Sequence, residues 1–575
     1  MATFIGELKR RNVVKVAAAY AAAAWLVAQI ADIVFPVFGL SDGFLRATFV
    51  VLGLGFPVTV ILAWIYDLTP EGIRRTDDMP ADAMRVSGRG LDFTIIGCLS
   101  VAVLFLALDR FVWSPPAVSG LPSIAVLPFT VEQPDAETGY LGSGISDSLI
   151  MRLSRLPQLK VKSRSMIRAD EKDVQALGKL LDVQAVCLGR LVRRGEVLEI
   201  AVELINVLDG SIMWSNRLRR NLSAIVSIES EVSAEIASAL SIELSDAEAA
   251  ELARSPTKNA EAYRLYLQGR HLWNQRSADG LRASADFYRQ AIDLDPGYAL
   301  AWAGLADSYL MLYGWGVETP QDVAPLALAS AQRAIELDPT LAEPHATIGY
   351  FKTLFERDWQ GAEAEFLKSI DLNRNYSTAH HWYAFYLSTI GRPKAAIDEI
   401  LKARESEPLS PIINAEVGLF LVYDEQYEKS IEEIKRAALW NPDFPSLLII
   451  QSRAYVMLGQ HEQASQAVDK ARSYFGDNIL MHGFSIIVLP LIGRTAETRA
   501  FYDMALRRSE TEYVPPAVLG VVAASLGEHD AAFKHFEHGL QERSLVVSWL
   551  RDPLIAGIRT DPRYAEMFER MGLTP

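Results

Sequence analysis

Few side chains in this 575-residue sequence have the types and spacing that catalysis needs. Gly142-Ser143-Gly144 precedes a helical pattern, and the free N–H groups at a helix N-terminus can hold a phosphate. The lysine that follows the glycines of a phosphate-binding loop is absent, so the simpler interpretation is that Ser143 or Ser146 caps the helix. No histidine lies between residues 1 and 270 to act as a base for either serine. We therefore expect neither nucleotide binding nor hydrolysis.

Two histidine pairs offer possible metal ligands. His380 and His381 are adjacent, and adjacent side chains point away from each other on a helix. His535 and His538 share one face, but no third ligand is evident near them. The two cysteines show no zinc spacing. Because histidine on a helix is more often a packing or surface residue, we expect no metal and no cofactor.

The charge balance excludes another class of function. The chain has 71 acidic and 56 basic residues, for a formal net charge of −15. Such a chain has no general attraction to nucleic acid, and the basic pairs Arg193-Arg194 and Arg219-Arg220 are too small to make a binding surface. Paired carboxylates such as Glu432-Glu433 are typical of a solvated helix face. We expect a protein that is not an enzyme and binds no nucleic acid.

Residues 1–117 are predicted to form a membrane region, because a bilayer-spanning helix needs about 20 apolar residues. Three apolar runs predict transmembrane helices, at about 13–35, 47–66 and 93–113. The third run reaches that length only across the Asp109-Arg110 pair, and it contains Cys98, so we expect no bridge to Cys187. The first run follows a basic stretch but is longer than the apolar part of a signal peptide, so we expect it to be retained.

Basic residues near the apolar runs predict the orientation of this region. Four lie before or at the start of the first run (Lys9, Arg10, Arg11 and Lys15), and four lie in loop 67–92 (Arg74, Arg75, Arg85 and Arg89). The positive-inside rule places both segments in the cytoplasm. Three spans then put all residues after about 115 in the periplasm of a bacterium, with the helices in its inner membrane. If the third run does not span, the prediction inverts.

From 121 to 246 the pattern becomes that of a small α/β domain. Short runs rich in β-branched residues predict strands, at 123–129, 159–162, 185–192, 197–207 and 211–219. Apolar residues at helical spacing predict helices, at 145–156, 173–181 and 225–244. Arg193-Arg194-Gly195-Glu196 and Asp209-Gly210 are hairpin turns, and residues 132–144 are predicted to be a loop.

Four stretches of this domain carry a resemblance to a known family. They are Ser-Ile-Ala-Val-Leu-Pro-Phe (123–129), Tyr-Leu-Gly-Ser-Gly-Ile-Ser-Asp-Ser-Leu (140–149), Ala-Val-Cys-Leu-Gly-Arg-Leu (185–191) and Glu-Leu-Ile-Asn-Val-Leu-Asp-Gly-Ser-Ile-Met-Trp-Ser-Asn-Arg (203–217). The domain resembles the TolB amino-terminal-like domain, although Gly-Ser-Gly stands where relatives often have an acidic residue before the glycine. The resemblance implies a non-catalytic domain joined to tetratricopeptide (TPR) repeats in a bacterial membrane protein. Some relatives add a winged-helix or an adenylate cyclase domain.

The rest of the chain is periodic. Proline follows a polar residue at the end of similar helical segments, at Pro296, Pro339, Pro408 and Pro442. Pro408 and Pro442 are 34 residues apart, and a 34-residue period of helix–turn–helix units is the signature of TPR repeats. We predict an all-α superhelical solenoid of about eight repeats over 257–546, with units starting at 265, 299, 342, 377, 411, 445, 479 and 513. Residues 547–575 are predicted to form capping helices.

Small residues recur at fixed positions within these units. They let paired helices approach closely and occupy the eighth position of a unit (Ala306, Gly349, Ala384, Gly418 and Gly520), the turn (Gly391, Gly459 and Gly527) and the second helix (Ala396, Ala464 and Ala532). Together with the four prolines they form the predicted structural signature of the array.

Stacked helix pairs form a superhelix with a concave groove, which binds peptides or partner helices. Polar and aromatic residues are predicted on its face, among them Asp307, Tyr350, His381 and Tyr455. The leading hypothesis is a non-enzymatic, membrane-anchored scaffold that binds proteins in the periplasm and can oligomerise through small residues of its membrane helices. The alternative is an envelope sensor or regulator, related to membrane transcriptional regulators or adenylate cyclases but without their output domain.

Overall fold

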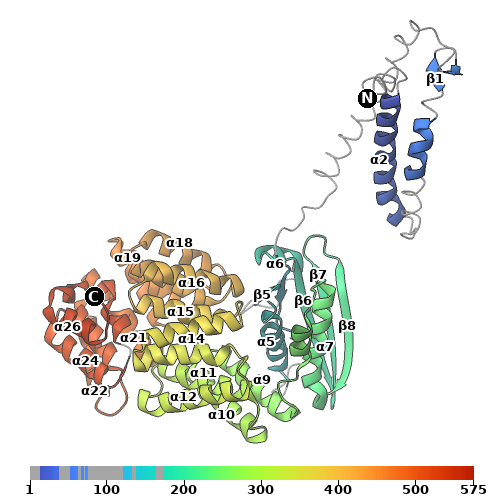
Figure 1. Cartoon of the computed structure of the whole chain (residues 1–575). Helices are drawn as coiled ribbons and strands as arrows, with labels where there is room; N and C mark the ends of the chain where they lie inside the picture. The colour runs from blue at the N-terminus through green and yellow to red at the C-terminus, as the bar shows by residue number, and fades with distance from the viewer. Residues whose placement is uncertain are drawn as a thin grey trace. The chain divides into compact units, whose positions relative to one another are not determined.

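A computed structural model describes residues 13–37, 52–61, 66–69, 72–75, 121–132, 138–163, 173–544 and 546–575. The chain divides into two compact units, Met1–Gly120 and Leu121–Pro575. The first contains the predicted membrane region. The second contains the α/β domain and the helical array (Figure 1).

In the first unit, helix α2 (Val13–Val37) covers the first predicted span, and a second helix covers residues 52–61. The Tyr20 hydroxyl donates to the Leu52 carbonyl over 2.8 Å and joins the two helices. Among the described residues, no helix combines the length and apolar character that crossing a bilayer requires. The third predicted span lies outside the described residues.

A two-stranded hairpin lies at the end of the second predicted span. Strand β1 (Tyr66–Thr69) pairs antiparallel with β2 (Gly72–Arg75), at the last residue of that span and in the predicted loop 67–92. Pro70 follows β1 directly and cannot continue a helix.

The α/β domain is built on a mixed sheet with the order β5-β3-β6-β7-β8. The strands are β3 (Ser123–Val126), β4 (Thr130–Val131), β5 (Lys160–Ser163), β6 (Ala185–Arg194), β7 (Val197–Asn206) and β8 (Ile212–Asn221). β3 pairs parallel with β5 and β6, while β6, β7 and β8 form an antiparallel meander. Gly195, with φ +62°, makes the predicted turn between β6 and β7. The short β4 pairs with the far end of β6.

Four helices accompany the sheet: α5 (Leu141–Ser154), α6 (Val174–Leu180), α7 (Ile225–Ala239) and α8 (Asp246–Ala253). The expected loop through 144 is wrong at its end, because α5 begins at Leu141 and its N-cap, Tyr140, makes no side-chain cap. Ser143 and Ser146 lie inside the helix, so neither is the predicted cap. The Ser146 hydroxyl instead donates to the Gly142 carbonyl over 2.9 Å.

The two glycines of α5 allow close packing on both sides of the helix. A Cβ at Gly142 would lie 2.1 Å from the Phe129 carbonyl oxygen, and one at Gly144 would lie 3.0 Å from Cβ of Leu267. Gly142 therefore brings α5 against the segment after β3, and Gly144 brings it against the first helix of the array. Their role is packing, which explains a glycine-rich sequence that does not form a phosphate-binding loop.

The array consists of eight antiparallel helix pairs. They are α9 (Ala260–Asn274) with α10 (Ala278–Leu294), α11 (Ala299–Gly314) with α12 (Pro320–Leu337), α13 (Glu343–Phe351) with α14 (Trp359–Leu372), α15 (Ser377–Thr389) with α16 (Pro393–Ser406), α17 (Pro411–Tyr423) with α18 (Tyr427–Ala438), α19 (Pro445–Met457) with α20 (His461–Arg472), α21 (Ile479–Ile486) with α22 (Thr495–Arg508), and α23 (Pro516–Ser525) with α24 (His529–Gln541). Five pairs begin at the residue expected for the unit: 299, 377, 411, 445 and 479. The first begins at 260 rather than 265. This is a TPR-type solenoid beside a small α/β domain.

Each turn within a pair holds one residue of left-handed backbone conformation. In five pairs it is glycine, with φ between +66° and +87° (Gly316, Gly391, Gly459, Gly493 and Gly527), and in three pairs it is Arg276, Arg357 or Glu425, with φ between +52° and +59°. The left-handed region favours glycine. The side chains of the two arginines make long-range contacts described below, which are unavailable to glycine.

Small residues also lie where helices meet. A Cβ would come within 3.0 Å of Phe366 at Gly349, within 2.5 Å of Ile434 at Gly418 and within 2.5 Å of Phe536 at Gly520. The signature alanines have no exposed surface: Ala306, Ala384, Ala396, Ala464 and Ala532.

The superhelix closes on itself. The Arg357 guanidinium donates to the Leu540 carbonyl over 3.0 Å, joining the third pair to the eighth. A Cβ at Gly316, after α11, would lie 3.5 Å from Cβ of Leu480 on α21.

The terminal segment (residues 546–575) contains α25 (Val547–Leu550), the 3₁₀ helix η7 (Pro553–Thr560) and α26 (Pro562–Arg570). It packs on the last pair, as an end cap would, through Leu550 and Phe568. It also reaches the middle of the array, where the Trp359 indole N–H donates to the Met571 carbonyl over 2.8 Å.

Candidate functional site

The concave face of the array contains a cavity of about 310 Å³. Its walls come from the first helices of the second to eighth pairs and from the start of the terminal segment. Aromatic side chains dominate the lining: Tyr313, Trp315, Tyr350, Trp382, Phe385, Phe420, Tyr423, Phe444, Phe484 and Trp549. The helices that form the cavity lie around the centre and left of the array in Figure 1.

The aromatic rings meet in stacked and edge-on pairs. Tyr350 stacks on Trp382 with ring centroids 4.7 Å apart, and Phe385 presents its edge to Tyr350 at 5.5 Å. Phe484 and Trp549 meet edge to face at 5.3 Å, so the terminal segment supplies part of the wall. Burial raises the pKa of the Tyr350 phenol, and the nearby Glu416 carboxylate adds to that shift. These rings form a rigid surface with defined faces.

A histidine–carboxylate contact lies in the same wall. Nε2 of His381 is 3.0 Å from Oε2 of Glu416, and these side chains are 9% and 19% exposed. Of the described residues that line the cavity, Glu416 is the only one with a carboxylate. The cavity therefore combines a mainly apolar surface with a few fixed polar groups, the usual composition of a ligand site.

Arg276 enters the cavity from the turn of the first pair. Its guanidinium carbon lies 3.7 Å over the Trp273 ring, and its Nη1 is 3.1 Å from the sulfur of Met311. Burial lowers the pKa of Arg276, while the nearby Glu407 and Asp307 oppose that shift. The backbone of Arg276 is in the left-handed conformation, which glycine adopts in five of the later pairs, but the Arg276 side chain supplies cavity contacts that glycine lacks.

The four residues predicted on the groove face separate into two sets. Tyr350 and His381 line the cavity. Asp307 is buried beside Thr347, whose hydroxyl donates to it, and burial raises the pKa of Asp307 to about 7. Tyr455 packs against apolar clusters of the later pairs. Asp307 and Tyr455 are not among the residues that line the cavity.

Sequence reasoning missed Trp382, Glu416 and Trp549. Trp382 and Glu416 are 34 residues apart, at the sixth position of successive units, and that shared position would have placed them on one face. Trp549 comes from the terminal segment, and no repeat position predicts it.

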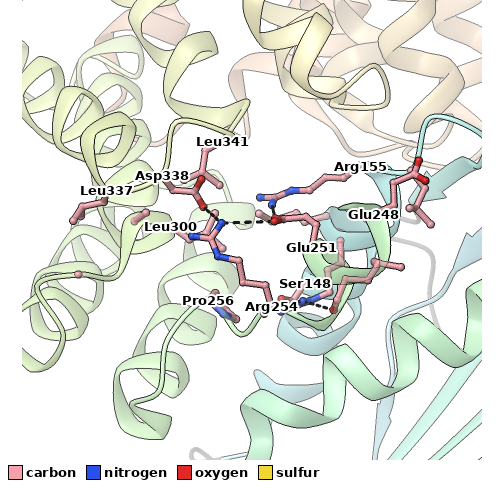
Figure 2. A pocket seen from close by; sticks show the side chains of 16 residues that line it. Ser148, Arg155, Glu248, Glu251, Arg254, Pro256, Leu300, Leu337, Asp338 and Leu341 are labelled. Atoms are coloured by element: carbon pink, nitrogen blue, oxygen red, sulfur yellow. Dashed lines mark hydrogen bonds and ion pairs between the residues drawn. The ribbon is translucent and has the colours of Figure 1, made fainter. Parts of the chain in front are cut away.

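A second pocket, of about 110 Å³, lies where the α/β domain meets the array (Figure 2). Figure 2 shows Arg155, Glu251, Arg254 and Asp338 converging on it. The Arg155 guanidinium is 2.6 Å from Glu251, and that of Arg254 is 2.9 Å from Asp338. Three of these residues come from α5 and the α8 region, while Asp338 precedes one of the predicted prolines. The Arg254–Asp338 ion pair thus connects the domain to a turn of the array.

Two further turns between helix pairs contact the α/β domain. The Asn375 amide donates to the carbonyls of Ser154 and Leu159 over 2.9 and 3.0 Å. Leu409, which follows Pro408, packs in an apolar cluster with Leu127 and Leu181 of the domain. Turns between successive helix pairs, two of them with a predicted proline (Pro339 and Pro408), therefore form a docking edge for the α/β domain, a role that the repeat pattern did not indicate.

One buried acid sits behind this junction. The Ser148 hydroxyl donates to Oε2 of Glu229 over 2.7 Å, and Nε of Arg152 lies 3.8 Å from the same oxygen. The Glu229 side chain has no exposed surface. Burial raises its pKa to about 7, against the opposing effects of Arg152 and Ser148.

Ser143 has a histidine partner that the sequence pattern did not predict. Its hydroxyl oxygen is 2.8 Å from Nδ1 of His271 on α9. His271 is the first histidine of the sequence, and it belongs to the array rather than to the domain. Nε2 of His271 lies 3.3 Å from the Gln275 amide nitrogen, where a catalytic triad would have a carboxylate. The pair joins α5 to α9.

The histidines of the two predicted pairs have separate partners, and the described cysteine is buried. Nδ1 of His380 is hydrogen-bonded to the Glu399 carboxylate, and its Nε2 lies 3.0 Å from the Arg374 carbonyl oxygen. The neighbouring His381 instead contacts Glu416. Nε2 of His535 is 2.9 Å from the Tyr502 hydroxyl, and Nε2 of His538 is 3.1 Å from Glu542. Neither pair converges on a common point. Burial raises the pKa of the Cys187 thiol to about 12, which keeps it protonated at neutral pH.

Residues 120–252 match the family described as HilA/YgeH-like transcriptional regulator, second domain. This range contains the residues that resemble a TolB amino-terminal-like domain. The chain is similar to a protein of Rhizobium meliloti (strain 1021) named "Putative adenylate cyclase 3", with 29% identity over 239 residues, or 41% of this chain and 40% of the relative. It is also similar to the transcriptional regulator HilA of Salmonella typhimurium, with 22% identity over 219 residues, or 36% of this chain and 38% of that protein. The chain thus spans about two fifths of these relatives.

Solved structures with partial similarity include pilF of Pseudomonas aeruginosa, with a TM-score of 0.29 and 17% identity over 37% of this chain and 93% of that chain. YrrB, described as a TPR protein with an unusual peptide-binding site, has a TM-score of 0.25 and 18% identity over 34% of this chain and 96% of its own.

Proposed function

We propose that this chain is a non-enzymatic scaffold that binds a partner protein through the aromatic cavity on the concave face of its TPR array. The observation that carries the proposal is the cavity itself, where ten aromatic side chains and the His381–Glu416 pair gather. Concave surfaces of helical repeat arrays are their usual binding faces, and aromatic anchors supply most of the energy of protein recognition.

The volume of the cavity limits how much of the partner protein can enter it. A volume of about 310 Å³ lies at the lower end of the ~300–1,000 Å³ typical of ligand pockets. The closure between Gly316 and Leu480 and the inserted Trp549 narrow the concave space. The binding element is therefore a few side chains of the partner, rather than the long extended peptide expected from an open groove.

Site-specific photo-cross-linking in living cells tests this function. Phe385, which lines the cavity, is replaced by p-benzoylphenylalanine, which keeps an aromatic side chain at that site. Leu367, 51% exposed on the second helix α14, is the matched control. We expect a discrete protein adduct from position 385 and none from position 367. Equal adducts from both positions, or none from position 385, would contradict the proposal.

The scaffold is proposed to be anchored in a bacterial inner membrane with the array in the periplasm. Support comes from the three apolar runs, from the helices at Val13–Val37 and 52–61, and from the basic residues on either side of the first two runs. Fusions of alkaline phosphatase and of a fluorescent protein after Pro575 test the orientation. Phosphatase activity without fluorescence is expected. Fluorescence without phosphatase activity would place the array in the cytoplasm.

The match of residues 120–252 to a domain of transcriptional regulators favours a second candidate function. In this alternative the α/β domain and the array form a sensor that relays occupancy of the cavity to a separate output protein. The ion pairs Arg155–Glu343 and Arg254–Asp338 across the junction would transmit the change. Hydrogen exchange distinguishes the two functions, because a relay predicts altered protection of α5 and α8 when the cavity is filled. A scaffold predicts unchanged protection there.

A further inference from the structure

The cavity presents a carboxylate among aromatic faces, and this combination selects for positive charge. We propose that the group it receives is an organic cation, such as the ammonium or guanidinium of a partner's lysine or arginine. The inference rests on the proposed function and specifies the chemistry of the same site.

The rings provide the first half of the recognition. A cation is attracted to the electron-rich face of Trp, Tyr or Phe within about 6 Å of the ring centroid. Tyr350 and Trp382 form a stacked pair, while Phe385 meets Tyr350 at a steep angle of 70°. Aromatic rings thus line the cavity in more than one direction, which suits a compact head group better than a flat ring.

Glu416 provides the second half. Its side chain is largely buried, 19% exposed, and its contact with His381 spans 3.0 Å. Among the described residues, none gives Oε2 of Glu416 an aligned hydrogen bond. A buried carboxylate oxygen without a hydrogen bond is costly. An ammonium or guanidinium in the cavity would supply both the missing donor and a compensating charge.

Arg276 does not already serve as that cation. Its guanidinium lies 3.7 Å over the Trp273 ring and contacts Met311. The nearby carboxylates of Glu407 and Asp307 favour its charged form. No ion pair between Arg276 and Glu416 occurs within the described residues. The positive charge of Arg276 is thus balanced at the first-pair end of the cavity.

The same wall already holds one guanidinium in this way. The Arg453 guanidinium carbon lies 3.8 Å over the ring of Phe484, a cavity residue, and its Nη1 is 2.5 Å from Asp552. An aromatic face and a carboxylate together bind that internal cation. Tyr350, Trp382 and Glu416 offer a similar set, and among the described residues no lysine or arginine forms an ion pair with Glu416.

The test is isothermal titration of the purified full chain with choline and with its neutral isostere 3,3-dimethylbutan-1-ol. These probes have nearly the same shape and differ in charge. We expect choline to bind at least tenfold more tightly, with quenching of the intrinsic tryptophan fluorescence. Equal affinity for the two probes would overturn the proposal.

Variants locate the effect. Glu416→Gln keeps the shape of the side chain and should weaken choline binding at least tenfold. Glu428→Gln, the same change at an exposed position of α18, should leave it unchanged. Trp382→Phe keeps an aromatic ring but weakens cation–π attraction, so it should lower affinity even if Glu416→Gln folds poorly. Unchanged choline affinity in both Glu416→Gln and Trp382→Phe would contradict the inference.

A lysine-containing peptide and free choline distinguish the two sources of the cation. Tighter binding of the peptide assigns the site to a protein partner, and tighter binding of choline assigns it to a free ammonium compound. Protein adducts from position 385, combined with no preference for cations, would support the proposed function while rejecting this inference.

Discussion

The array is held at two places by different kinds of contact. Besides apolar contacts with Leu267 and Leu409, the α/β domain docks on turns between helix pairs through partly exposed ion pairs. These are Arg155–Glu343 and Arg254–Asp338, in which the arginines are 20% and 49% exposed. The terminal segment docks inside the superhelix, where the Arg453–Asp552 pair is 0% and 1% exposed. The ion pairs of the first attachment are accessible to solvent, and the ion pair of the second is buried.

This difference has physical consequences. Exposed ion pairs contribute only about 0–1 kcal/mol each and are screened by salt. A buried pair is costly to break, because removing one partner leaves an uncompensated charge in the interior. The junction can therefore respond to solution conditions, while the terminal closure is expected to remain fixed and to define the cavity.

The largest effect should follow loss of the buried cation. Arg453→Ala leaves the Asp552 carboxylate buried and unpaired, so we expect the free energy of unfolding to fall by about 3–5 kcal/mol. Urea unfolding of the full chain measures it. Arg404→Ala, which removes a partly exposed partner of Glu433, should cost less than about 1 kcal/mol. An equal fall in the free energy of unfolding in the two variants would show that the buried and the exposed ion pairs do not differ in their contribution to stability.

A pH effect should arise on the side of the α/β domain. The pKa of Glu229 is about 7 in the folded protein against 4.5 for an unperturbed glutamate. Between these values the folded state binds a proton on Glu229 that the unfolded state lacks, so the contribution of Glu229 to the free energy of unfolding falls as pH rises. From pH 5 to pH 8, the free energy of unfolding of the unmodified protein should fall by up to about 3 kcal/mol relative to that of Glu229→Gln.

Denaturation at several pH values measures this loss. Glu196→Gln, at the exposed β6–β7 turn, is the control and should reproduce the pH profile of the unmodified protein. A profile of Glu229→Gln parallel to that of the unmodified protein would show that Glu229 does not titrate in this range.

High salt should weaken the contacts between the α/β domain and the array, and leave the contacts of the terminal segment unchanged. Arg254→Gln removes the contacts with Asp338 and Glu251, and we expect a loss of roughly 0.5–1 kcal/mol at low ionic strength. Because a Debye length of about 3 Å at 1 M salt screens exposed pairs, the loss should vanish there. Hydrogen exchange should report faster exchange in α8 and unchanged exchange in α26. Faster exchange in α26 would mean that the two attachments are coupled.

An effect of intermediate size concerns the left-handed turns. Glu425→Gly and Arg357→Gly both relieve a strained backbone at φ +59° and +56°, but only Arg357 donates to Leu540 across the closure. We expect Arg357→Gly to be less stable than Glu425→Gly by about 1.5–3 kcal/mol, the value of a hydrogen bond from a charged donor. Paired thermal denaturation measures the difference. Equal stability would show that the Arg357 contact adds nothing to the closure.

Local chemistry explains what the sequence predicted well. Turn residues and small residues at a 34-residue spacing act within a few positions of each other, so the helix pairs from Ala299 and Ser377 begin where expected. The β6–β7 hairpin likewise follows from Gly195. Gly142 and Gly144 misled the prediction because tertiary packing, rather than a turn, requires them.

The rest depends on contacts between distant residues. Arg357 and Leu540 are 183 positions apart, and Trp359 and Met571 are 212 apart. A repeat pattern fixes each pair of helices, but small rotations between successive pairs decide whether the superhelix closes. The cavity was therefore unpredictable in size, although the shared repeat position of Trp382 and Glu416 could have indicated its polar wall.

A single disulfide measures the closure most directly. In a chain with Cys98 and Cys187 replaced by alanine, Gly316→Cys and Leu480→Cys are introduced together. The Cβ positions of these residues are 3.5 Å apart, within the ~3.5–4.5 Å of a disulfide. Mild oxidation should link them in nearly all molecules, seen as a faster band on a non-reducing gel and as linked peptides by mass spectrometry. Two freely reactive thiols in the folded protein would show that the array stays open and that the cavity does not exist as described.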